Sequence, residues 1–157
     1  MVDYPILIFK IALPKKFMEL QEILKDPFLI LGVGNSDRGD DGIGIYVIER
    51  LKTEYKLKCG PMPENFTGKI RRMGPKNILM IDAVDFGGEP GETIITEAEK
   101  AEGLTLTTHS LPLSLMCKML PESKIYILGI QPESFEKMTE KVKSSGDALV
   151  KELNSLV

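Results

Sequence analysis

Three acids and the single histidine of the chain stand within or just after separate apolar runs. The stretch LGVGNSDRGDDGIG, residues 31–44, follows an apolar run and carries the pair Asp40 and Asp41. Asp82 interrupts the apolar run NILMIDAV, and His109, the only histidine, ends the segment LTLTTH. If two carboxylates and one imidazole converge, they form an O,O,N site for a divalent metal ion or an acid–base cluster.

The glycine-rich loop 31–44 does not match the common phosphate-binding patterns. Phosphate binds where backbone amides and a helix dipole converge, and the carboxylates of this loop oppose that. The dinucleotide pattern G-x-G-x-x-G needs a third glycine where Asp37 stands, and the Gly-Lys pair at 68–69 lacks the serine or threonine of a P-loop. A calcium loop that begins at Asp37 would place Ile48 where a glutamate must bind. The loop is therefore an acidic turn of another kind.

Each acid also has a purely structural interpretation. Asp40 and Asp41 fit the N-cap position of the following helix about equally well, so one of the two is left over. Asp82 lies in an apolar strand, where a buried carboxylate is costly unless it is paired or ligating, which favours a functional role. Asp85 precedes Phe-Gly-Gly and is expected to form a turn. Glu64 is expected to be solvated or to cap a helix, with a role at the site as the alternative.

The composition indicates one domain and gives no sign of nucleic-acid binding. The chain has 157 residues, 43% of them hydrophobic, which is enough for one domain with its own core. A net charge of −3 without a long basic run leaves no electrostatic footprint for nucleic acid. Lys10 interrupts a short N-terminal apolar run, so neither a secretory signal nor a membrane span is expected. Cys59 and Cys117 match no metal or redox spacing, which favours reduced thiols in the cytoplasm.

Apolar runs alternate with amphipathic segments, and this alternation predicts an α/β fold. We expect a mostly parallel twisted sheet with helices on both faces, in three α/β/α layers, and one short antiparallel edge strand. The predicted strands are 28–34, 77–84, 93–97 at the edge and 124–130, with a further segment at 104–109. The predicted helices are 15–25, 41–55, 111–120 and 134–156. Residues 4–13 are expected to form a strand or buried run, and 60–68 a Gly/Pro-rich loop. The chain 1–157 is then a single α/β domain, with 1–27 as an addition to the core 28–157.

The expected sheet brings the candidate residues to one place. Ligands of an open parallel sheet collect at the carboxyl ends of the strands, where loops lead into helices. This rule selects Asp40 and Asp41 after the first strand, Asp82 and Asp85 in the second, and His109 after the segment 104–109.

Three segments together resemble a known family. They are LGVGNSDRGDDGIG, NILMIDAVDFGGEPGE and TTHSLPLSLMCKMLPESKIYILGIQPES. In order and spacing they resemble the hydrogenase maturation endopeptidases, which trim the C-terminal tail from the large-subunit precursor of nickel-iron hydrogenases. The segment GIQPE points to the subgroup that serves hydrogenase-3-like enzymes. The resemblance covers residues 28–157.

The resemblance implies a protease whose site contacts nickel. Matched motif to motif, it implies that Asp41, Asp82 and His109 are both the catalytic residues and the metal contacts, as in an aspartic-type endopeptidase with a bound metal. The nickel is implied to come with the precursor and not to be held permanently. The expected partner is therefore a hydrogenase large-subunit precursor, with no nucleic acid, no membrane insertion, and a monomeric enzyme in the cytoplasm.

One departure from the family pattern concerns substrate choice. Many members carry an acid and a glycine pair before the PEN segment, whereas this chain has LKCGPMPEN, with Lys58 and Cys59 in those places. Glu64 is then a replacement acid for substrate binding.

Three other functions remain open at the level of sequence. A non-cleaving relative could dock a nickel-loaded precursor or sense metal. A serine hydrolase could use His109 with Ser110 or Ser114, although the chain has no G-x-S-x-G elbow. Asp41 and Asp82 could also act as an aspartic dyad.

Overall fold

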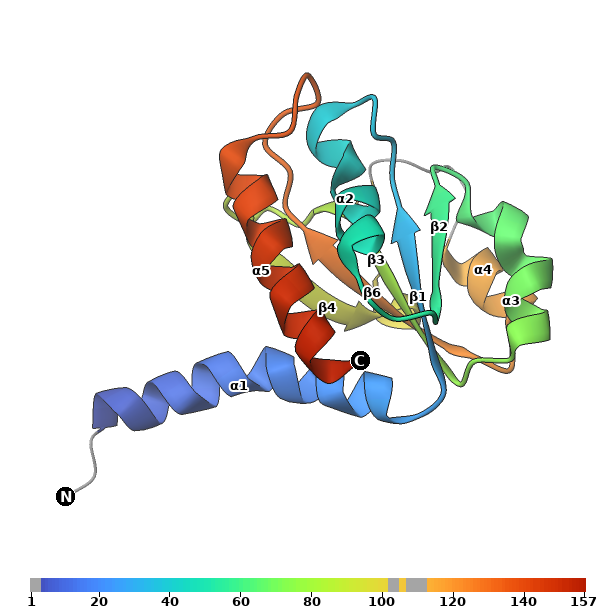
Figure 1. Cartoon of the computed structure of the whole chain (residues 1–157), viewed down its shortest axis with the longest axis horizontal. Helices are drawn as coiled ribbons and strands as arrows, with labels where there is room; N and C mark the ends of the chain where they lie inside the picture. Colours follow the sequence, from blue (N-terminus) through green and yellow to red (C-terminus); the bar gives the residue numbers. More distant parts are fainter. Residues whose placement is uncertain (1–3, 102–104, 107–112) are drawn as a thin grey trace.

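A mostly parallel sheet with one antiparallel edge strand lies at the centre of the molecule (Figure 1). The structure is a computed structural model that describes residues 4–101, 105–106 and 113–157, with 4–14, 105 and 106 described by their backbone. The strands are β1 (Phe28–Val33), β2 (Lys56–Gly60), β3 (Asn77–Asp85), β4 (Thr93–Glu97), β5 (Thr105–Leu106) and β6 (Lys124–Ile130). The helices are α1 (Tyr4–Lys25), α2 (Ile43–Arg50), α3 (Thr67–Met73), α4 (Leu113–Met119) and α5 (Glu140–Leu156), with 3-10 turns η1 (Gly39–Gly42), η2 (Pro63–Phe66) and η3 (Ala98–Lys100).

The strand order is β2-β1-β3-β6-β4, and β5 pairs with β3. The strands β1, β2, β3 and β6 run parallel, whereas β4 pairs antiparallel with β6 at one edge. The three apolar runs of the sequence form the central strands because both faces of a covered parallel sheet are buried. The predicted fold class and the antiparallel edge strand at 93–97 are confirmed.

Helices cover both faces of this sheet with separate apolar cores. On one face α2 and α5 lie side by side, joined by the second half of α1 (Figure 1). On the other face α3 and α4 pack against the opposite side chains of the same strands. Ile45 and Ile48 of α2 and its C-cap residue Leu51 are buried. None of the helices in the described ranges combines the length and the apolar character that a membrane crossing needs.

Residues 4–13 begin helix α1, so the strand that was one of the two expectations for them is wrong. An apolar run of this length does not distinguish a buried strand from a helix by its pattern alone. Pro5 is tolerated since it lies in the first turn, where backbone amides have no partner within the helix. The second half of α1 is buried through Leu20, Ile23 and Leu24.

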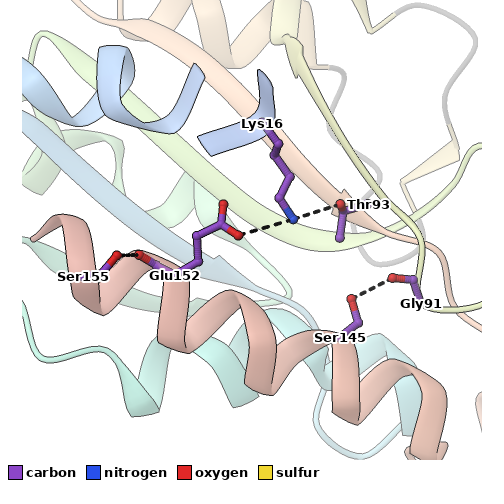
Figure 2. Close-up of polar contacts among 6 residues, drawn as sticks. All are labelled: Lys16, Gly91, Thr93, Ser145, Glu152 and Ser155. Carbon is purple, nitrogen blue, oxygen red and sulfur yellow. Dashed lines mark hydrogen bonds and ion pairs between the residues drawn. The ribbon is translucent and has the colours of Figure 1, made fainter. Parts of the chain in front are cut away.

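Polar contacts from the edge of the sheet complete the attachment of α1 and α5. Figure 2 shows Lys16 of α1 between Thr93 of β4 and Glu152 of α5, with its Nζ 3.3 Å from Thr93 Oγ1 and 3.8 Å from Glu152 Oε2. Ser145 Oγ of α5 donates to the carbonyl of Gly91, just before β4 (2.7 Å). These contacts connect the edge strand to both helices.

The predicted helix 41–55 is too long, and strand β2 was missed. Leu51 is extended, with φ −76° and ψ 142°, so α2 ends at Arg50. The Nζ of Lys56 donates to the carbonyls of Ile48 (3.0 Å) and Leu51 (2.6 Å), which satisfies acceptors that the helix end leaves open. The chain then forms β2, whose alternating burial is that of an edge strand.

Two further boundaries differ from the prediction. Helix α3 lies partly within the expected loop 60–68, and α5 begins at Glu140 instead of residue 134. The residues before α5 form a loop because their amides bind a side chain from a distant segment, as described below.

Candidate functional site

The carboxyl ends of the parallel strands lie at the same end of the sheet, and we call this end the carboxyl rim. It comprises the loops that follow β1, β2, β3 and β6. Asp41 lies in η1 after β1, Asp82 lies near the end of β3, and Glu64 lies in η2 after β2. The strand-end rule therefore placed Asp41 and Asp82 correctly at this rim, whereas it did not select Glu64.

Asp41 is fully buried in the short 3-10 turn η1. Its amide donates to the carbonyl of Arg38 (3.1 Å), and its carbonyl accepts from the amide of Asn35 (3.1 Å). The Nη1 of Arg38 lies 3.7 Å from Asp41 Oδ2. The chain turns at Gly34, whose φ is +144°. Glycine is needed at this position because a Cβ would collide with the carbonyl oxygen of Asp41. The loop thus holds an acid at the rim beside a cation.

Asp82 is fully buried inside the central strand β3. Its Oδ1 accepts a hydrogen bond from the amide of the next residue, Ala83 (2.8 Å). The last paired residue of β1 opposite β3 is Gly32, which lies level with Ile81, so Asp82 stands just where β1 gives way to its loop. This is the position from which a β3 side chain can meet the loop after β1.

Close packing joins the Asp41 turn to the strand of Asp82. Gly44, three residues after Asp41, lies so near β1 and β3 that a Cβ there would approach the carbonyls of Val33 and Ile81 to under 3.0 Å. Ile81 directly precedes Asp82. The turn η1 also contacts β3. The structure therefore brings the two predicted acids to the same part of the rim.

The other two candidates are Glu64, which the structure describes, and His109, which it does not. Glu64 is half-buried, and its Oε2 is buried without a hydrogen bond to any residue that the structure describes, so it is not simply solvated. His109 lies outside the described residues, as do Ser110 and the end of the segment 104–109. The chain enters that stretch from β5, whose Leu106 pairs with Val84 of β3. In the described ranges no group of three His, Cys, Asp or Glu side chains could hold a metal ion.

Asp40, one of the two acids that fit the N-cap of the following helix by sequence, does not cap it. The N-cap of α2 is Gly42, without a side-chain cap, and the carboxylate of Asp40 binds residues 133–139 instead. Asp85 forms the expected turn, since its Oδ1 accepts from the amide of Gly87 (3.1 Å). It also accepts from Nε2 of Gln131 (3.1 Å), a residue that the sequence analysis overlooked. Gln131 directly follows an apolar strand, so the strand-end rule applied to β6 would have found it.

Neither of the residues that depart from the family pattern, Lys58 and Cys59, supplies a reactive group. Lys58 is exposed and pairs with Glu49 at 3.0 Å. Cys59 is buried, and this burial raises the pKa of its thiol to about 12. A thiol with so high a pKa stays protonated near neutral pH and is a poor ligand and nucleophile. Both cysteines are free.

Comparison with known proteins identifies the family. The family model of HycI, the hydrogenase maturation protease, matches residues 45–156. The chain belongs to the hydrogenase maturation protease family. The hydrogenase 3 maturation protease of Escherichia coli K12 is 35% identical over 136 residues, covering 80% of this chain and 87% of that protein.

Solved structures of hydrogenase maturation proteases have the same fold. The crystal structure of HycI from Thermococcus kodakarensis KOD1 aligns with a TM-score of 0.77 and 35% identity, over 88% of this chain and 97% of that one. The solution structure of the endopeptidase HycI from Escherichia coli aligns with a TM-score of 0.72 and 30% identity, over 82% and 90% of the two chains. The resemblance stated from the sequence motifs, and the enzyme class that it implied, are confirmed.

Proposed function

We propose that this hydrogenase maturation protease removes the C-terminal extension of a nickel-iron hydrogenase large-subunit precursor after nickel insertion. In this proposal Asp41, Asp82 and His109 contact the nickel that the precursor carries. The observation that carries it is the pair of fully buried acids at neighbouring parallel strand ends. Carboxylates are the ligand type that divalent metal ions commonly take from proteins, so two of them at neighbouring strand ends favour a site that receives a cation.

The donor set suits a metal that arrives with the substrate. Two carboxylates and one imidazole leave coordination positions open, unlike the closed four-ligand shell of a structural site. Softer sulfur ligands in a precursor would hold nickel more tightly than these donors alone. An enzyme without a nickel-loaded precursor would then be almost inert, which would prevent cleavage before the metal is in place.

Different structural elements hold the two acids that could transfer the proton during hydrolysis. Nickel bound between enzyme and precursor would place the scissile peptide at the rim and polarise its carbonyl group. A carboxylate must accept the proton of the attacking water and pass it to the leaving amine. Asp82 is held by β3, and Asp41 is held by its turn beside Arg38, so either can serve. Glu64, with a buried oxygen at the same rim, is the proposed contact for the precursor tail.

The test is cleavage of purified large-subunit precursor, with and without nickel, read by mass spectrometry of the released tail. We expect cleavage of the nickel-loaded precursor alone. Asp41→Asn and Asp82→Asn should abolish it while far-UV circular dichroism stays unchanged. Asp37→Asn is the matched control, since this exposed acid lies in the same loop as Asp41. It should keep full activity.

Three outcomes would contradict the proposal. Equal cleavage of nickel-free precursor would mean that the two acids act on the peptide directly, as an aspartic dyad. A wild-type protein that binds nickel-loaded precursor without cutting it would be a docking module. Full tail removal by Asp82→Asn would exclude this acid from the site.

We further propose that the enzyme acts as a monomer in the cytoplasm. Two free cysteines suit a reducing compartment. Light scattering on the purified protein should give the mass of one chain, and the mass of a dimer would contradict this.

A further inference from the structure

The segment 131–139, which connects β6 to α5, is bound to the side chain of Asp40. Asp40 is fully buried. Its Oδ2 accepts hydrogen bonds from the amides of Glu133 (2.9 Å) and Ser134 (3.0 Å) and from the hydroxyl of Thr139 (2.9 Å). Its Oδ1 accepts from the amide of Thr139 (2.7 Å). The residue directly before Asp41 thus uses its whole carboxylate to hold a loop from another strand.

The same segment holds the turn that follows Asp82. Gln131 is 8% exposed, and its Oε1 accepts from the amides of Phe86 (2.9 Å) and Gly88 (3.1 Å). Its Nε2 donates to Oδ1 of Asp85 (3.1 Å). One buried amide side chain therefore binds two amides of the loop after β3 and the carboxylate of Asp85 at the end of β3.

The segment 131–139 also contacts Arg38, the cation beside Asp41. The guanidinium carbon of Arg38 lies 5.0 Å from the ring centroid of Phe135, within the range of a cation–π interaction. Gly39, at φ +57°, fits against the segment so closely that a Cβ would lie 2.8 Å from the carbonyl oxygen of Ser134. The turn η1 and the segment are packed surface to surface.

The topology explains why one segment can bind both the turn that carries Asp41 and the loop that follows the strand of Asp82. Strand β3 lies between β1 and β6 in the sheet, so a loop from the end of β6 that contacts the loop after β1 must bridge the end of β3. The segment 131–139 does this, with Gln131 at the β3 side and Asp40 bound at the β1 side. The strands alone do not orient these loops, because the loops lie beyond the last paired residues.

We propose that Asp40 and Gln131 are positioning residues, which act through the segment 131–139 as one brace that fixes Asp41 and Asp82 relative to each other. This inference rests on the proposed function, in which those two acids form the site. Groups that orient the residues of a site commonly contribute about 10–100-fold to activity when removed. The brace also gives a physical role to the GIQPES motif, which no step of the proposed reaction uses.

The first test is the kinetics of precursor cleavage by Asp40→Asn and Gln131→Leu. Both residues are buried and the proposal gives neither a contact with the precursor, so we expect kcat to fall about 10–100-fold with KM nearly unchanged. Thr139→Ser is the conservative control, because it keeps the hydroxyl that binds Asp40, and it should retain kcat. Leu153→Ala is the stability control. It opens a cavity near the far end of α5 and should lower Tm without lowering kcat below the unfolding transition.

A variant with both substitutions distinguishes a shared action of Asp40 and Gln131 from two independent local effects. If both residues act through one segment, Asp40→Asn with Gln131→Leu should lose about as much kcat as the worse single variant. Losses that multiply would contradict the inference. If Asp40→Asn fails to fold, Thr139→Val removes one of its four hydrogen bonds and takes its place.

A second measurement does not depend on activity. In Asp40→Asn, the amides of Phe86 and Gly88 should exchange hydrogen faster than in wild type, although Asp40 does not touch them. Unchanged exchange at these amides would overturn the brace, as would kcat values equal to that of Leu153→Ala. Failure of the proposed function looks different, because Asp82→Asn would then cleave normally whatever the exchange rates.

Discussion

Replacing Gly44 by alanine should destabilise the protein, although alanine is the better helix former. An added Cβ would approach two backbone carbonyls, those of Val33 in β1 and Ile81 in β3, to under 3.0 Å, where ordinary contacts begin at 3.4 Å. Backbone oxygens of two paired strands cannot move independently, so α2 must shift. Overpacking of this kind costs about 1–3 kcal/mol, and we place this case at the upper end because both obstacles are rigid.

The net effect follows from two opposing contributions. The gain in helix propensity from glycine to alanine is about 1 kcal/mol, which leaves a loss of about 2 kcal/mol after the overpacking cost. For a chain of this size that loss lowers Tm by about 4–8 °C. Thermal unfolding followed by far-UV circular dichroism measures it directly.

A matched substitution in another helix should have the opposite sign. Gly68 lies in α3, and a Cβ there would meet only Nη1 of Arg72 at 3.6 Å, the end of a flexible side chain. Gly68→Ala should therefore raise the unfolding free energy by about 0.5–1 kcal/mol. If Gly44→Ala unfolds at or above the wild-type Tm, the close packing of α2 on the two strands is refuted.

Two further predictions concern the thiols and helix α1. In the folded protein near pH 8, a disulfide reagent should modify the half-buried Cys117 first, and Cys59 only as the protein unfolds, because burial raises its pKa to about 12. Above its unfolded pKa of 9.0 the thiol keeps its proton in the folded protein but loses it in the unfolded chain. The unfolding free energy should therefore fall as pH rises from 9.0 toward 12, and Cys59→Ala should make that fall smaller. Leu20→Ala should cost about 2–5 kcal/mol, since Leu20 is fully buried, whereas Lys16→Met should change stability by less than about 1 kcal/mol, since its contacts are partly exposed. Equal labelling rates of the two thiols, or equal costs of the two substitutions, would contradict these expectations.

The fold was predictable wherever burial leaves a strong local pattern. The central strands β1, β3 and β6 are buried on both faces, so they read as continuous apolar runs. The edge strand β2 was missed because its lysines alternate with Leu57 and Cys59, which a short stretch does not distinguish from a helix end followed by a loop. Residues 4–13 failed for the same reason, since apolar character alone does not decide between strand and helix.

Some residues of the candidate site could likewise be predicted from a local pattern, and others could not. Asp82 could be found because a carboxylate inside an apolar strand conflicts with its surroundings, and such conflicts mark functional positions. The sequence around Asp40 and Asp41 could not show that Asp40 binds a distant segment instead of capping the helix. The partners of Asp40 lie 93 to 99 residues further along the chain, and nothing in the sequence near Asp40 marks them.

The sequence by itself determined the parallel sheet, the family, and the acids at the strand ends, because burial periodicity and motif spacing are properties of contiguous residues. Only the tertiary structure decided what Asp40 and Gln131 do. Their hydrogen bonds join loops from β1, β3 and β6, which become neighbours when the sheet forms. Contacts between distant segments depend on strand order, and strand order is set by the packing of the whole chain rather than by any one stretch of it.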